Sequence, residues 1–113
     1  MENDEMVLKE LLEFSLPKDV LDEKLKSIGW DTDFNVVLKK AHIQAILQRY
    51  LSGQLNSEQV EWWANAIESR EDIEVCNDNQ GVEDAIYQLA NPVLTEQLSP
   101  SVANQLLLNL ANR

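Results

Sequence analysis

Residues 56–68, NSEQVEWWANAIE, contain the clearest helical pattern of the chain. Apolar side chains recur there at steps of three and four residues, which is the spacing of one face of an α-helix. The inner face predicted for this helix consists of Val60, Trp63, Ala64 and Ile67. Asn56 or Ser57 precedes the apolar run, and both are residue types that cap helix N-termini. The segment therefore predicts a capped amphipathic helix that packs on a core.

The same spacing extends over most of the chain on both sides of this segment. Further helices are predicted over about residues 4–15, from Pro17 to Gly29, from Lys39 to Leu51, from Val82 to Ala90, and from Pro100 to about Leu110. Two short runs, Phe34–Leu38 and Ile73–Cys76, are extended in character and are candidates for strands. We therefore expect a mainly α fold: a compact bundle of five or six short helices with at most a small two-stranded β element, in one domain spanning residues 1–113.

Composition excludes several classes of function. The 113 residues include 20 Asp and Glu against 9 Lys and Arg, for a net charge of −11. Such a chain is not expected to bind nucleic acid or anionic membranes through a general basic surface. Cys76 and His42 are the only residues of their types, and there is no glycine-rich phosphate loop. We expect a protein that is not an enzyme and needs no cofactor.

The amino-terminal sequence MENDEM lacks the basic and apolar regions of a signal peptide, and no apolar stretch is long enough for a membrane span. A single cysteine fits a reducing compartment. These features predict a cytoplasmic protein. Residues 31–35, DTDFN, match the first ligand positions of a helix-loop-helix calcium site, but Val36 and His42 stand where that loop needs glycine and glutamate. No metal site is expected.

The acidic residues are concentrated in one part of the chain. Residues 54–96 contain ten acidic residues and a single basic residue, Arg70. A surface of this charge attracts a basic partner, although a merely solvated acidic face is the alternative. The predicted partner-binding residues are Glu58, Glu61, Trp62, Glu68, Glu71, Asp72 and Asp78. Trp62 is the expected exposed aromatic anchor. The alternative is that Trp62 lies under a loop or under the amino-terminal helix.

Three runs have a familiar pattern: HIQAILQRYLSGQLNSEQVEWWA at residues 42–64, AIESREDIE at 66–74 and AIYQLANP at 85–92. Together they resemble small acidic bacterial immunity proteins of the colicin-immunity and contact-dependent growth inhibition kind. The similarity covers roughly residues 36–110. The resemblance implies tight inhibition of a cognate toxin domain with a basic surface, usually a nuclease whose active-site groove the immunity protein covers. It supplies no site residues position by position.

The favoured interpretation is an immunity protein that acts as a monomer or a weak homodimer. The alternative is a non-enzymatic regulatory or structural adaptor, possibly a homodimer that uses the Trp62 face. A hydrolase with paired carboxylates is the third interpretation, but no motif in the sequence supports it.

Overall fold

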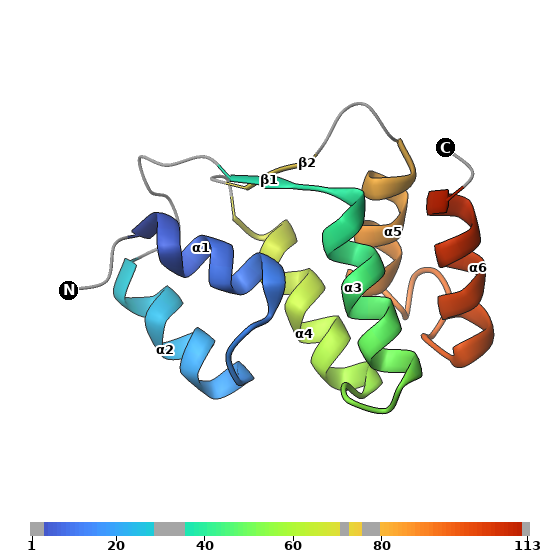
Figure 1. Cartoon of the computed structure of the whole chain (residues 1–113), viewed down its shortest axis with the longest axis horizontal. Coiled ribbons are helices and arrows are strands. Elements are labelled where there is room, and N and C mark those ends of the chain that lie inside the picture. Colours follow the sequence, from blue (N-terminus) through green and yellow to red (C-terminus); the bar gives the residue numbers. More distant parts are fainter. Residues whose placement is uncertain (1–3, 29–35, 71–72, 76–79, 112–113) are drawn as a thin grey trace.

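The computed structural model describes residues 4–28, 36–70, 73–75 and 80–111 (Figure 1). The elements within these ranges are, in chain order, α1 (Asp4–Glu13), α2 (Lys18–Ile28), β1 (Val36–Leu38), α3 (Lys40–Leu51), α4 (Ser57–Glu68), β2 (Ile73–Val75), α5 (Gln80–Ala90) and α6 (Pro100–Ala111). The prediction of a mainly α bundle with a small two-stranded element is confirmed.

Helix α4 is the central helix of the bundle. It contacts α1 and α2 on one side, and α3 and α5 on the other. Figure 1 shows α1 and α2 together at one end of the molecule and α6 at the opposite edge, where it packs on α3 and α5. The long axis of the molecule, 41 Å, runs between these two ends. The segment with the clearest helical pattern in the sequence therefore holds the two halves together.

The two strands pair in parallel, with Val36 opposite Ile73 and Leu38 opposite Val75. Parallel neighbours need a crossover connection, and α3 and α4 together provide it. Val36 and Leu38 are buried while Val37 between them is partly exposed, as the alternation of a strand requires. Both strands lie within the predicted runs, whose remaining residues, 34, 35 and 76, lie outside the described ranges.

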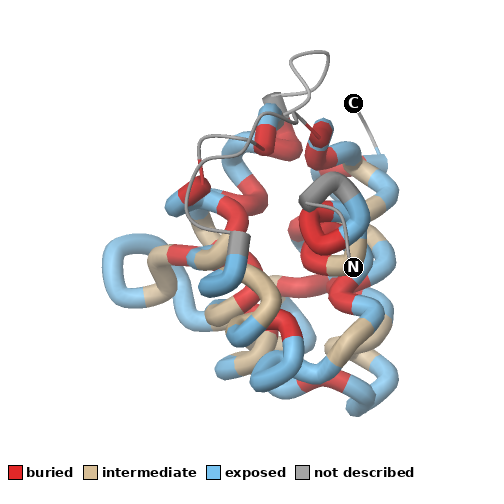
Figure 2. The backbone as a smooth tube through the Cα atoms, turned by 90° about the vertical axis from the view of Figure 1, so that its left-hand side faces the viewer, coloured by how far each residue is buried: buried red, intermediate tan, exposed pale blue. Residues whose placement is uncertain are grey.

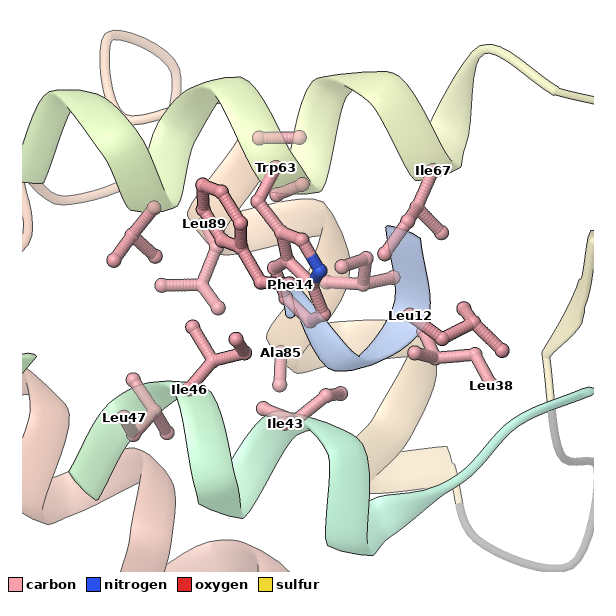
Figure 3. Close-up of a cluster of buried hydrophobic side chains, with 14 of the residues drawn as sticks. Leu12, Phe14, Leu38, Ile43, Ile46, Leu47, Trp63, Ile67, Ala85 and Leu89 are labelled. Carbon is pink, nitrogen blue, oxygen red and sulfur yellow. The ribbon is translucent and has the colours of Figure 1, made fainter. Parts of the chain in front are cut away.

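Trp63 lies at the centre of the hydrophobic core (Figure 3). Its side chain is fully buried, and its indole Nε1 donates a 2.8 Å hydrogen bond to the Leu11 carbonyl of α1. The other members of the predicted inner face, Val60, Ala64 and Ile67, are buried as well. Figure 2 shows buried residues where the helices face one another and exposed residues on their outer sides. The predicted inner face of α4 is confirmed.

Local hydrogen bonds set the ends of the helices. Asn56, and not Ser57, caps α4: its Oδ1 accepts from the Gln59 backbone N–H at 2.8 Å, and Gln59 Oε1 accepts from the Asn56 N–H at 2.8 Å. This reciprocal pair is a capping box. Gly53, which follows α3, has a φ of +87°, a conformation that favours glycine. These local rules explain why residues 52–56 form a tight connection between α3 and α4.

The first helix is shorter than predicted, because it ends at Glu13 rather than near residue 15. Phe14 has a φ of +48°, in the left-handed region, and its side chain is nevertheless buried. Arg49 of α3 stabilises this turn, since its Nη1 donates to the carbonyls of Glu13 (3.2 Å) and Phe14 (3.0 Å). A long-range contact therefore sets the end of α1.

Candidate functional site

The helices α4 and α5 form the most extensive contact between any two elements of the fold. Their outer side carries a set of exposed carboxylates, which we call the acidic face: Glu58, Glu61 and Glu68 on α4, Glu83 and Asp84 on α5, and Glu96 after α5. Residues 54–96 contain no base except Arg70, and the Arg70 side chain is 5% exposed. The acidic face therefore presents negative charge to solvent without a neighbouring exposed cation from this segment.

Two hollows lie along the junction of α4 and α5. The first, of about 250 Å³, includes Glu58, Glu61 and Glu96 in its lining, with the buried Leu89. The second, of about 380 Å³, includes Glu68, Glu83, Asp84 and the exposed Tyr87, and its lining also contains Arg70 of this chain. The first hollow combines carboxylates with an apolar residue and contains no cation, an arrangement that suits a long basic side chain with its aliphatic stem.

A hydrogen bond joins the two helices on this side. Asn91, directly after α5, donates from Nδ2 to Glu68 Oε1 at 3.3 Å and to the Tyr87 carbonyl at 2.9 Å. The Asn91 backbone N–H also donates to the Tyr87 carbonyl at 3.0 Å. The position of Glu68 is thereby tied to the end of α5, so that the carboxylates of the two helices belong to one surface.

Trp62 does not belong to the acidic face, and the expectation of a solvent-facing Trp62 surrounded by carboxylates is wrong. Its side chain is partly buried against the core, with its ring centroid 5.7 Å from that of Phe14. Consecutive residues on a helix point about 100° apart, so that Glu61 faces the α5 side while Trp62 faces the α2 side. The alternative, in which Trp62 packs against the amino-terminal helices, matches the structure.

Trp62 lines a separate hollow of about 410 Å³ between α2 and α4. The other lining residues are Asp22, Leu25 and Lys26 of α2, with Asn65, Ala66, Ser69 and Arg70. Lys26 Nζ lies 3.1 Å from Asp22 Oδ2, so these two charges are paired with each other. The Phe14 ring that supports Trp62 also lies under the Arg49 guanidinium, at 5.6 Å. The surroundings of Trp62 are therefore set by how α1 and α2 pack on α4, and not by the carboxylates of α4.

The seven predicted partner-binding residues fall into three groups. Glu58, Glu61 and Glu68 are exposed together on the acidic face, and Trp62 lies on the other side of α4. Glu71, Asp72 and Asp78 lie outside the described residues. The prediction missed Glu83, Asp84 and Glu96, which the packing of α4 on α5 brings to the same surface. The high acidic content of residues 54–96 was the only sequence signal that included them.

His42 has a structural role in α3. Its Nδ1 accepts a hydrogen bond from the Lys39 backbone N–H at 3.0 Å, and its side chain is partly buried. Burial lowers the pKa of His42, with Lys39 adding to this effect and Glu13 opposing it. Within the described ranges, no three histidine, cysteine or acidic side chains are grouped as a metal site would require. Residues 31–35, which partly match a calcium loop, lie outside those ranges.

Of the helices that the structure describes, none is both long enough and apolar enough to cross a membrane. Comparisons of the chain with protein-family models, with curated proteins and with solved structures gave no match. The geometry of the acidic face is therefore the main basis for a functional proposal.

Proposed function

We propose that this protein is a non-enzymatic immunity protein of the bacterial cytoplasm. It binds a cognate toxin domain with a basic surface, most simply a nuclease, and neutralises it. The observation that carries the proposal is the acidic face, on which six exposed carboxylates of α4, α5 and the following segment converge. The resemblance of residues 36–110 to immunity proteins supplies the class of partner.

The mechanism follows from charge. A nuclease holds the phosphates of its substrate in a basic groove, and a protein with a dense array of carboxylates competes for the same cations. The hollow beside Glu58, Glu61 and Glu96 takes up an Arg or Lys side chain, with the carboxylates pairing the charge and Leu89 contacting the aliphatic stem. Electrostatic attraction of this kind raises association rates toward about 10⁸ M⁻¹s⁻¹ at low salt.

The alternative, an adaptor that dimerises through Trp62, has less support. Trp62 is partly buried against Phe14, so that much of its ring is already covered within one chain. An aromatic anchor contributes to binding chiefly through area that remains free for the partner.

Capture of the partner tests the proposal. The tagged protein is expressed in its own cells, and bound proteins are eluted by a rising salt gradient. We expect one basic protein that is retained at low salt, is released at high salt and is toxic when expressed alone. Co-expression of the present chain should remove that toxicity. If no basic toxic protein is retained at low salt, the immunity function is wrong.

A charge-reversed pair of variants then tests the surface. Glu61→Lys changes the acidic face, whereas Glu23→Lys changes an exposed carboxylate of α2 by the same amount of net charge. We expect Glu61→Lys to slow association with the captured partner by about tenfold at low salt, and Glu23→Lys to have a much smaller effect. Equal effects of the two variants would mean that net charge, and not the acidic face, directs the partner.

A further inference from the structure

The segment that joins α5 to α6 carries the two most exposed large apolar side chains in the described part of the chain. Val93 is 95% exposed and Leu94 is 73% exposed. A single exposed apolar side chain is ordinary on a protein surface, but two consecutive ones keep a larger apolar area in water. We call residues 91–95, NPVLT, the apolar turn. It exposes apolar area that the core of the chain does not use.

Hydrogen bonds hold the apolar turn in one conformation. The Asn91 carbonyl accepts from the backbone N–H groups of Leu94 at 3.1 Å and Thr95 at 3.0 Å. Thr95 Oγ1 lies 2.8 Å from the same carbonyl oxygen and 3.2 Å from that of Gln88 in α5. Pro92 adds a fixed φ. A segment held in this way loses little conformational entropy when a partner covers it, which is the advantage of a preorganised contact.

The apolar turn is continuous with the acidic face. Pro92 of the turn lines the hollow of about 250 Å³ that Glu58 and Glu61 of α4 also line. At the start of the turn, the Asn91 side chain donates to Glu68 of α4 at 3.3 Å. The turn and the carboxylates of α4 therefore belong to one surface, and a partner that covers the hollow also lies against the turn.

We propose that the apolar turn is the hydrophobic anchor of the partner-binding surface, and that it is covered by the basic protein that the acidic face attracts. This inference rests on the proposed function and adds a second requirement for the partner, an apolar depression beside its cations that takes Val93 and Leu94. The surrounding charge selects this occupant, because a protein that reaches the turn also meets Glu58, Glu61 and Glu96. An acidic occupant, including a second copy of this chain with its net charge of −11, is repelled there.

The carboxylates and the apolar turn are expected to act on different rate constants. Carboxylates attract cations before the two proteins touch, so they raise the association rate, and salt screens this effect. Apolar area stabilises a complex only once water has left the contact, so Leu94 is expected to slow dissociation. The partner is therefore steered by charge and retained by apolar contact.

Photo-crosslinking from the turn tests the proposal in the protein's own cells. Val93→p-benzoylphenylalanine places the photoreactive group on the turn, and Leu108→p-benzoylphenylalanine places it elsewhere as the control. Leu108 is 57% exposed on α6, in a hollow of about 720 Å³ beside α3 whose lining carries no charge. We expect a crosslink to one basic protein from position 93 and not from position 108. Adding Glu61→Lys should reduce its yield about tenfold, because the same partner contacts both parts of the surface.

Rate constants measured with the purified crosslinked partner separate the two contributions. Leu94→Ala should raise the dissociation rate about tenfold and leave the association rate and its salt dependence unchanged. Leu108→Ala is the matched control, because it removes the same atoms from another exposed leucine, and it should change neither rate. Circular dichroism checks that both variants remain helical.

Each outcome decides between the anchor and the immunity function. A basic toxic partner that gives no crosslink from position 93, or equal dissociation rates for Leu94→Ala and Leu108→Ala, would overturn the anchor and leave the immunity function standing. A crosslink that Glu61→Lys reduces, but to a basic protein that is not toxic, would support the anchor and contradict the immunity function. If neither capture nor crosslinking yields a basic protein, both are wrong.

Discussion

The α4–α5 pair and the α3–α6 pair pack on one hydrophobic core, but their solvent-exposed surfaces differ in charge. Buried residues of α4 such as Trp63 and buried residues of α6 such as Leu106 belong to the same cluster. The outward side of the first pair carries five carboxylates, with Glu96 beside them, whereas the lining of the hollow on the second carries no charge. Apolar spacing therefore decides which helices pack together, and the solvent-facing positions are free to form two surfaces of different charge.

The largest expected effect comes from Trp63 of α4, which belongs to the core cluster that both pairs share. Trp63→Ala removes a fully buried indole and leaves the Leu11 carbonyl without its 2.8 Å hydrogen bond. We expect a loss of about 3–5 kcal/mol in the free energy of unfolding. Urea denaturation followed by circular dichroism measures this loss. Partner binding by the acidic face should be lost when the variant unfolds, and an unfolded variant that still bound the partner would contradict a surface formed by packed helices.

A charge exchange tests the comparison directly. The double variant Glu61→Gln/Gln48→Glu moves one carboxylate from the acidic face to an exposed position of α3 and conserves both composition and net charge. We expect partner association to weaken by about tenfold, equivalent to about 1.4 kcal/mol. Both positions are exposed, so that the stability should change by less than about 0.5 kcal/mol. Stopped-flow association gives the readout, and an unchanged rate would mean that the position of the charge is irrelevant.

The cap of α4 gives a smaller effect that concerns stability alone. Asn56→Ala removes the side-chain acceptor for the Gln59 N–H and should cost about 1 kcal/mol in denaturation. Ser57→Ala is the matched control, because Ser57 is the first residue of α4 and does not cap it. Partner affinity should be unchanged in Asn56→Ala under conditions in which the protein is folded. Equal losses in both variants would contradict the assignment of the cap.

The smallest expected effect is a pH dependence of stability, which we expect at the start of α3 and not at the start of α4. The Lys39 N–H at the start of α3 donates to His42 Nδ1, which can accept only when it is unprotonated, whereas the Asn56 amide of α4 does not titrate. Burial lowers the pKa of folded His42 below the usual value of about 6.5. The unfolded state therefore binds the proton first, so stability is complete above pH ~6.5 and falls as pH drops below it. His42→Gln should flatten this slope in denaturation curves between pH ~7.5 and ~5; an unchanged slope would exclude His42 as its source.

Local sequence rules explain much of the fold. The inner face of α4 and the connection around Gly53 follow from helical spacing and turn chemistry, both of which involve residues close in sequence. The left-handed backbone conformation of Phe14 could not be predicted from neighbouring residues, because Arg49 from another helix stabilises the turn. Parallel pairing of the strands likewise depends on the crossover through α3 and α4, which spacing alone does not reveal.

The candidate site was less predictable for the same physical reason. The acidity of residues 54–96 is a property of composition, but its convergence on one face depends on how α4 packs on α5. Trp62 was misplaced because its covering residue, Phe14, is distant in sequence. Exposure of a residue on a helix can be inferred from its own helix only where no other element covers that face.

Because Trp63 donates a hydrogen bond to the Leu11 carbonyl, the fluorescence of Trp63 can be used to measure whether α1 is packed on α4. An indole in a dry environment emits at shorter wavelength than one in water, so the emission of Trp63 depends on whether α1 is docked on α4. Its neighbour Trp62 is only partly buried and is more accessible to a neutral quencher such as acrylamide. In a Trp30→Phe variant, a red shift of the fluorescence emission would indicate that α1 has detached from α4. Quenching by acrylamide without a red shift would indicate that only Trp62 is exposed.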